Sequence, residues 1–142
     1  AAVEEYVAAE RRWVSVPDMP RAVYGVAAVA WEGKLLVIGG LSSELFKLLS
    51  AGVLEYSPGE GTWRELPSLR TARGWCAATV YQGEVVALGG VGPGNERLAS
   101  VERYDRRSQR WEAMPSLTSP MSHVHAASVV LLPRSFPISV GV

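Results

Sequence analysis

The stretch WCAATVYQGEVVALGG, residues 75–90, has a counterpart 50 residues earlier in GVAAVAWEGKLLVIGG, residues 25–40. Each reads as a short apolar run, a turn that contains glycine, a second apolar run and then two glycines. Glycine reaches positive φ without steric cost, so a Glu-Gly or Gln-Gly step between two such runs predicts a tight β-hairpin. Both stretches are therefore expected to form two antiparallel strands that end at a diglycine.

The hairpins belong to a longer repeat that is marked by aromatic residues. A tyrosine is followed by a tryptophan seven residues later, and the tryptophan by a proline four residues later, in three places: Tyr6, Trp13 and Pro17; Tyr56, Trp63 and Pro67; Tyr104, Trp111 and Pro115. The period is 50 and then 48 residues, which is typical of propeller repeats. Further strands are expected at residues 53–56 and 62–66, and again at 101–104 and 110–114. Four antiparallel strands in each period predict a propeller blade.

Diglycine, tyrosine and tryptophan at this fixed spacing resemble the kelch repeat, and the resemblance extends to about residue 130. It implies an all-β fold, a partial kelch β-propeller of four-stranded antiparallel blades, with two full blades and flanking half-blades. In that family the diglycine closes the second strand, and the tyrosine and tryptophan pack between neighbouring blades. We expect an outer half-blade at residues 1–16, blades at 21–68 and 71–116, and an incomplete, divergent blade at 119–142.

The ends of the chain do not complete a repeat. Residues 3–6 correspond to a third strand, and the third copy runs through an inner strand expected at residues 123–130 into Pro133 and Pro137 without a diglycine. Closed propellers have about four to eight blades, and each blade buries its faces only against its neighbours. We therefore expect a piece of a longer propeller, or, less readily, two copies that complete a six-bladed ring. Self-association of the incomplete array is expected for the same reason.

Two segments also carry helical features. Residues 1–12 are rich in alanine, glutamate and arginine, which favour helix, but the spacing of Tyr6 and Trp13 favours strands. Residues 42–51 contain leucines at helical spacing behind Ser42 or Ser43, either of which could cap a short helix. This loop is two residues longer than its counterpart in the next repeat. Two interpretations of this segment stay open: a binding loop, or a segment that folds back on its blade.

Composition limits the classes of partner. The net charge is zero and the pI is near 7, so neither nucleic acid nor an anionic membrane surface is favoured. No apolar run approaches the roughly 20 residues of a membrane-spanning helix. The single cysteine, Cys76, excludes an internal disulfide framework and suits a reducing compartment. These features predict a cytoplasmic protein in which Cys76 is a buried, unreactive thiol.

Motifs for catalysis and metal binding are weak. Residues 89–94 contain four glycines, but no Lys-Ser/Thr step or helix follows, so a phosphate-binding loop is rejected. His123 and His125 would share one face of a strand, yet no third metal ligand lies near them in the sequence. Arginines and acidic residues alternate over residues 102–112, which favours a solvated rim over a nucleic-acid patch. We expect no enzyme activity, no cofactor and no metal.

The loops that enter each blade, and those that follow each diglycine, should gather on one end of the propeller, called here the rim face. They comprise residues 17–24, 67–75 and 115–123, together with 41–52 and 91–99. Arginine and aromatic side chains dominate interface hot spots, and the partner-binding candidates on this face are Arg21, Tyr24, Arg70, Arg73, Trp75, Asn95 and Arg97. Two roles stay open for Arg73: contact with a partner, or hydrogen bonds that tie strand ends together. The local positive charge favours an acidic peptide.

The resemblance implies a protein–protein interaction module of an intracellular kelch propeller that presents its rim loops to a partner or substrate peptide. One form of this function is a substrate receptor for a cullin-type ubiquitin ligase. The alternatives are a scaffold that binds actin or the cytoskeleton, and a fragment of a kelch-type oxidase or epimerase. An enzyme would require clustered ligands or acid and base pairs on the rim, which this sequence lacks.

Overall fold

The structure is a computed structural model that describes residues 1–42 and 48–126, and this part of the chain contains strands and no helix. Two short sheets pair β1 (Val3–Val7) with β2 (Arg12–Val16), and β3 (Val23–Tyr24) with β6 (Leu41–Ser42). The first blade is a four-stranded sheet of β4 (Ala27–Trp31), β5 (Lys34–Ile38), β7 (Val53–Ser57) and β8 (Thr62–Leu66). The second blade contains β9 (Ala77–Tyr81), β10 (Glu84–Leu88), β11 (Val101–Asp105) and β12 (Arg110–Met114).

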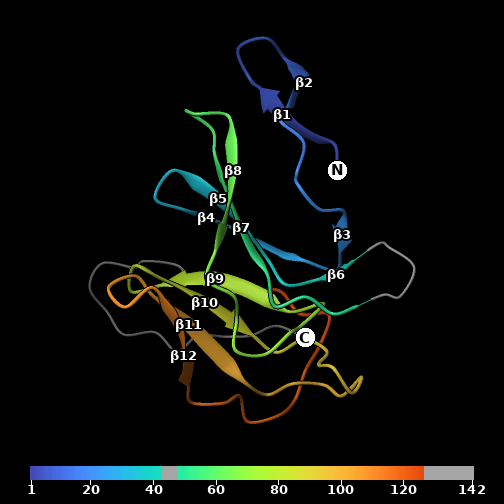
Figure 1. The fold of residues 1–142 in the computed structure, drawn as a ribbon, viewed down its shortest axis with the longest axis vertical. Coiled ribbons are helices and arrows are strands. Elements are labelled where there is room, and N and C mark those ends of the chain that lie inside the picture. The colour runs from blue at the N-terminus through green and yellow to red at the C-terminus, as the bar shows by residue number, and fades with distance from the viewer. Residues whose placement is uncertain (43–47, 127–142) are drawn as a thin grey trace.

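The predicted all-β fold is confirmed. The outer strands β8 and β12 have the predicted bounds, and β7 and β11 extend one residue further, to Ser57 and Asp105. The helix-favouring residues at the start of the chain form β1 and the beginning of β2. At this place the spacing of the aromatic residues predicts the structure better than local helix propensity does. Tertiary packing commonly overrides such propensity. The β1–β2 hairpin, the first blade and the second blade follow one another in space (Figure 1).

Two expectations fall wholly or partly outside the described residues. Half of the segment considered for a short helix, residues 43–47 of 42–51, lies there. Of its described residues, Ser42 is in β6, Leu49 forms an antiparallel bridge with Leu41, and none is helical. The inner strand expected from residue 123 is not formed over residues 123–126. The rest of that expected strand, and the second strand that Pro133 and Pro137 put in doubt, belong to residues outside the described part. The incomplete blade at 119–142 therefore stays a prediction.

The repeated tyrosines and tryptophans face each other across paired strands. Tyr56 lies opposite Trp63, and Tyr104 opposite Trp111, with ring centroids 4.9 and 5.5 Å apart. The indole N–H of Trp63 donates to the carbonyl of Pro17 at 2.8 Å, and that of Trp111 to the carbonyl of Pro67 at 2.9 Å. The backbone carbonyl of the proline that follows one tryptophan thus accepts a hydrogen bond from the tryptophan of the next repeat.

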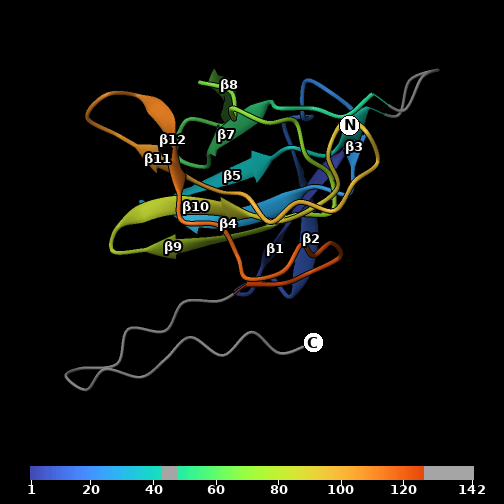
Figure 2. The same cartoon turned by 90° about the horizontal axis from the view of Figure 1, so that it is seen from below.

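An apolar core joins the two blades. Side chains of β5 and β7, among them Leu36, Ile38 and Val53, form one buried cluster with Val85 and Ala87 of β10. Trp31 closes this cluster, with its ring edge on Tyr104 at 5.9 Å and its indole N–H on the carbonyl of Gly83 at 2.9 Å. The innermost strands β4 and β9 lie beside each other (Figure 2). Each blade therefore contributes one face to a shared core, as propeller blades do.

The diglycines bring the next repeat against the end of each blade. Gly40 donates its N–H to the carbonyl of Arg73, and Gly90 donates to the carbonyl of Met121, both at 2.8 Å. A Cβ on Gly39 would lie 2.3 Å from the oxygen of Arg73, and a Cβ on Gly89 would lie 2.7 Å from the oxygen of Met121. Both glycines also have positive φ, 68° and 61°. No larger residue fits these positions without a shift of the neighbouring backbone.

Candidate functional site

Three equivalent residues of successive repeats form a hydrogen-bonded row on the rim face. Trp75 donates its backbone N–H to the carbonyl of Gly25 at 2.7 Å, and His123 donates to the carbonyl of Trp75 at 2.9 Å. All three have left-handed backbone, with φ of 62°, 48° and 57° along the chain. Glycine adopts this conformation freely, whereas a bulky residue is strained by about 1–3 kcal/mol. The fold therefore holds a tryptophan and a histidine where it would more readily hold glycine.

Side chains along this row stack on one another. A Cβ built on Gly25 would lie 3.1 Å from the Trp75 ring, so the absence of a side chain there makes room for the indole. The imidazole of His123 stacks on the other indole face, with centroids 5.2 Å apart and an interplanar angle of 28°. Tyr24 meets Trp75 edge-on at 6.1 Å. The result is a row of three rings, Tyr24, Trp75 and His123, of which Tyr24 and His123 are exposed.

Two hollows adjoin Trp75. One of about 410 Å³ is bounded by Tyr24, Trp75 and Asn95, and its remaining walls are formed by Leu41, Leu49, Val91, Gly92 and Pro93. The other, of about 390 Å³, follows the beginnings of β4 and β9 and residues 123–126, where most of the lining side chains are small. Concave, mostly apolar surfaces with a few polar groups are typical of binding sites. The first hollow opens beside exposed residues of the rim loops and is called here the Trp75 hollow.

Arg73 is fully buried below the rim face. Its Nη1 donates to the carbonyls of Gly89 at 2.9 Å and Ser100 at 3.0 Å. Its Nη2 donates to the hydroxyl of Ser100 at 3.0 Å and to a carboxylate oxygen of Glu102 at 2.6 Å. These contacts tie the end of β10 to the beginning of β11. Of the two roles left open by the sequence, the geometry supports the structural one, and Arg73 presents no surface to a partner.

Glu102 completes this buried network. Besides the ion pair with Arg73, its carboxylate accepts the backbone N–H groups of Arg70 at 2.7 Å and Thr71 at 3.1 Å. A buried carboxylate requires such compensation, because an unpaired charge in the interior is costly. No motif in the sequence points to Glu102. Its only sequence signal is its place two residues before the repeated Tyr104, where the preceding repeat has Leu54.

The remaining arginines of the rim face are exposed. Arg21 pairs with Glu65 at 2.7 Å, and both side chains are largely in solvent. Neither Arg70 nor Arg97 forms an ion pair with another residue that the structure describes. Asn95 is exposed, in a turn with φ of 63°. Of the seven predicted partner-binding residues, the structure thus brings Tyr24, Trp75 and Asn95 to one hollow.

Cys76 and the histidines show no reactive or metal-binding arrangement. The Cys76 thiol is buried, and this burial raises its pKa, so the thiolate that would act as a nucleophile is disfavoured. Within residues 1–42 and 48–126, no three His, Cys, Asp or Glu side chains are placed to hold a metal ion. The same residues include no helix long and apolar enough to span a membrane.

Comparisons with known proteins agree with the architecture. Residues 22–70 and residues 72–118 each match the Kelch motif. The mouse protein Kelch-like protein 38 is 32% identical over 120 residues, which are 84% of this chain and 20% of that protein. The chain therefore spans about one fifth of the length of this curated relative. Both matches concern the repeat itself.

A solved structure extends the comparison to the fold. The structure of YjhT superposes with a TM-score of 0.71, over 87% of this chain and 47% of that one, at 14% sequence identity. At this identity the likeness concerns the fold alone. Together with the repeated motif matches and the relative, it supports one assignment: the chain belongs to the kelch-repeat family.

Proposed function

We propose that this chain is a protein-interaction module of a kelch propeller, and that a partner polypeptide binds its rim face at the Trp75 hollow. The observation that carries the proposal is the strained backbone at Trp75, which holds a large ring beside Tyr24 over a mostly apolar hollow. Strained conformations persist where the surrounding structure enforces them, and they cluster at binding sites. Tryptophan and tyrosine in a hollow are frequent interface hot spots.

The exposed arginines of the rim loops favour an acidic partner segment. Arg70 and Arg97 are exposed and have no ion-pair partner among the described residues. Exposed ion pairs such as Arg21–Glu65 contribute at most about 1 kcal/mol, so a partner carboxylate can replace Glu65 at little cost. Each guanidinium can hold a carboxylate through two parallel hydrogen bonds. The partner is therefore a segment that carries acidic residues next to a bulky apolar side chain.

We also propose one cellular role for the module. The kelch resemblance suggests a non-enzymatic substrate receptor for a cullin-type ubiquitin ligase in the cytoplasm, in which the rim face would hold the substrate. This step is tested separately, by co-precipitation of a cullin with the longest natural form of the protein. A longer form that binds partners without a cullin would leave the interaction module in place and remove the ligase role.

A displayed library of random peptides, selected on the folded chain, tests the interaction itself. We expect enrichment of sequences with Asp or Glu beside Trp, Phe or Leu. Trp75→Gly then removes the ring but leaves a residue that tolerates the backbone conformation, as Gly25 does in the preceding repeat. It should weaken binding of a selected, fluorescently labelled peptide at least about ten-fold, a loss of about 1.4 kcal/mol, without lowering the melting temperature.

The charge requirement has its own variants. Replacing Arg70 and Arg97 together by alanine should weaken binding and reduce its dependence on salt, because salt screens exposed charges. Arg107→Ala is the matched control, since Arg107 is exposed in the turn between β11 and β12, away from the hollow. Selected peptides without acidic residues, or binding unchanged by Trp75→Gly, would contradict the proposal.

A further inference from the structure

A third hollow lies between the two blades, apart from the Trp75 hollow. It measures about 340 Å³ and is called here the interblade groove. The turn between β4 and β5 and the turn between β11 and β12 border it, at the strand ends opposite the diglycines. Its lining comes from both blades and consists of Trp31, Glu32, Lys34, Glu55, Arg64, Glu65, Leu66, Pro67, Tyr104, Arg106 and Gln109.

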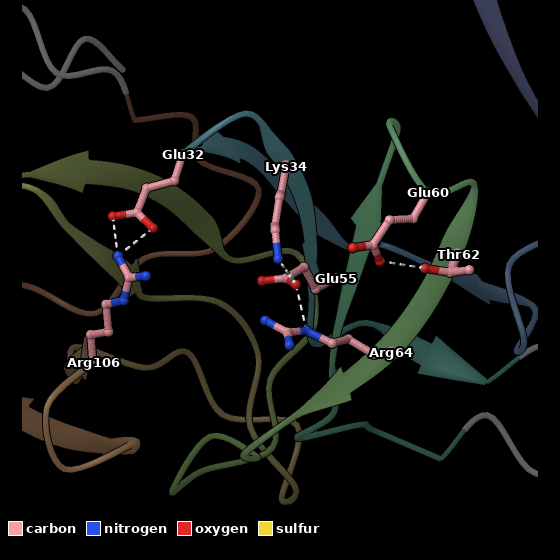
Figure 3. Close-up of polar contacts among 7 residues, drawn as sticks. All are labelled: Glu32, Lys34, Glu55, Glu60, Thr62, Arg64 and Arg106. Atoms are coloured by element: carbon pink, nitrogen blue, oxygen red, sulfur yellow. Dashed lines mark hydrogen bonds and ion pairs between the residues drawn. The ribbon is translucent and has the colours of Figure 1, made fainter.

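A buried carboxylate with two cations stands in this groove. Glu55 is almost fully buried, and one of its carboxylate oxygens accepts from both Lys34 Nζ at 2.8 Å and Arg64 Nε at 2.5 Å (Figure 3). Two positive charges therefore meet one negative charge. Of the other charged groups that line the groove, Arg106 bonds Glu32 and Glu65 bonds Arg21, while nearby Glu60 keeps its negative charge and accepts from the Thr62 hydroxyl. Glu55 thus holds Lys34 and Arg64 together in the groove, and Arg64 is bonded there through Nε alone among the described residues.

Several hydrogen-bond donors in the groove are unused. The Arg64 side chain is 60% exposed, and its two terminal amino groups have no hydrogen-bond partner among the described residues. Tyr104 is only 4% exposed and lines the groove, yet its hydroxyl also has no partner in that part of the chain. The Tyr104 hydroxyl oxygen is not itself enclosed, so it is open to the groove. Donors of this kind that converge on a hollow indicate a ligand with acceptor atoms.

The equivalent place in the second blade shows that the fold does not require these free donors. The positions of Lys34, Glu55 and Arg64 correspond there to Glu84, Arg103 and Glu112. Arg103 uses both terminal nitrogens, each at 2.9 Å from a carboxylate oxygen. Cross-strand hydrogen bonds thus use both terminal nitrogens of the arginine in the second blade, whereas in the first blade they leave the terminal nitrogens of Arg64 without a partner among the described residues.

We propose that the interblade groove binds an oxyanion, the carboxylate of an acidic side chain or the phosphate of a modified one, carried by a polypeptide. Arg64 supplies the forked contact that suits either group. Lys34 adds a second positive charge, and the Tyr104 hydroxyl donates from the opposite blade. Trp31, with the Arg106 guanidinium 5.6 Å above its ring, bounds the site. This site is distinct from the rim-face hollow and does not depend on the function proposed for it.

The test uses the whole chain and simple anions. Inorganic phosphate and acetate are titrated separately at constant ionic strength, and the indole resonance of Trp31 and the Arg64 Nε–H resonance are followed by NMR. We expect saturable shifts of both resonances. Tighter binding of phosphate would identify a phosphorylated residue as the natural ligand, and equal or tighter binding of acetate an acidic side chain.

Two variants separate binding from folding. Arg64→Lys keeps the positive charge beside Glu55 but removes the fork, and should weaken anion binding by about ten-fold. Tyr104→Phe keeps the buried ring and removes only the hydroxyl, and should weaken binding several-fold. Arg110→Lys, on the exposed side of β12, is the matched control and should change nothing. The absence of saturable shifts, or unchanged affinity in both Arg64→Lys and Tyr104→Phe, would overturn the proposal.

Discussion

The two full blades share one strand register but stabilise it with different chemistry. The second blade buries the Arg73–Glu102 ion pair, whereas the equivalent positions of the first blade hold Val23 and Leu54. Elsewhere in the sheets, a cation–carboxylate–cation set in the first blade has a charge-reversed counterpart at the equivalent positions of the second. The difference shows which features the repeat requires. Close backbone contacts recur in both blades, while the charged residues differ, and the central charge of each set is bonded to two opposite charges within its own blade.

The buried ion pair offers the most direct way to break this comparison. Removing one partner of a buried pair typically costs about 3–5 kcal/mol, because the other charge stays buried alone. We expect Arg73→Val and Glu102→Leu each to lower the free energy of unfolding by about that amount. The double variant, which copies the first blade, should be more stable than either single variant. Urea unfolding gives the free energy of unfolding of all three variants. If the loss in the double variant equals the sum of the two single losses, the residues of the first blade cannot replace those of the second at these positions.

The diglycines should be equally sensitive in both blades, since both have the next repeat packed against them. Gly39→Val and Gly89→Val should each destabilise by about 1–3 kcal/mol through clash and positive φ. Gly59→Val is the control, because Gly59 lies in a turn, does not have positive φ and has no atom within 4 Å of an added Cβ. Thermal unfolding followed by circular dichroism compares them. Equal melting temperatures for Gly39→Val and Gly59→Val would refute the packing argument.

The same distinction explains how much the sequence could predict. Diglycine, Tyr56–Trp63 spacing and the following proline each meet a geometric requirement of the blade, so their recurrence predicts strands, turns and their pairing. The bond between Arg73 and Glu102 joins residues 29 positions apart and occurs in only one of the two full blades, so no repeated signal points to it. The sequence therefore leaves both roles of Arg73 open, contact with a partner and hydrogen bonds between strand ends.

The left-handed backbone at Trp75 carried a weaker signal that was not used. Gly25 occupies the equivalent position one repeat earlier, and a glycine at one copy of a repeat suggests positive φ at the others. Tryptophan and histidine themselves give no indication of positive φ at Trp75 and His123. Residues that break a local rule are where prediction from sequence fails, and they are also where functional sites are expected.

The pKa of Glu55 allows the charged sets of the two blades to be compared by experiment. Burial opposes its ionisation, but hydrogen bonds from Arg64 and Lys34 outweigh this, so the pKa of Glu55 lies below its ordinary value. A carboxyl whose pKa is lower in the folded state stabilises the fold above its unfolded-state pKa, and this contribution is lost as the pH falls through the folded-state pKa.

Glu55→Gln should therefore destabilise at neutral pH, by about 1–3 kcal/mol for the lost charged hydrogen bonds, and much less at low pH. Urea unfolding across a pH series from neutral to strongly acid measures the difference. In the second blade, Glu112→Gln should have a smaller effect, because that set is more exposed. If Glu55→Gln lowers the free energy of unfolding equally at every pH, the ion pairs with Arg64 and Lys34 do not lower the pKa of Glu55.

The smallest stability effect is expected in the β1–β2 hairpin, where the repeat residues lack their neighbours. Trp63 and Trp111 each donate to a proline carbonyl, whereas the Trp13 side chain is 64% exposed and its indole N–H has no partner among the described residues. Trp63→Phe and Trp111→Phe should each cost about 1 kcal/mol. Trp13→Phe should change the free energy of unfolding by less than about 0.5 kcal/mol, as exposed substitutions usually do.

What Trp13 should affect instead is association. It stacks near Tyr6, which is 49% exposed, with ring centroids 5.4 Å apart. Adjacent exposed aromatic rings mark an interaction surface. We expect the chain to self-associate, and Trp13→Ser to shift its sedimentation profile toward smaller species at a melting temperature close to that of the unaltered chain. Tyr81→Ser is the control, because Tyr81 is also exposed but lies on β9, at the other end of the array. An unchanged distribution for Trp13→Ser would show that the hairpin aromatics do not drive association.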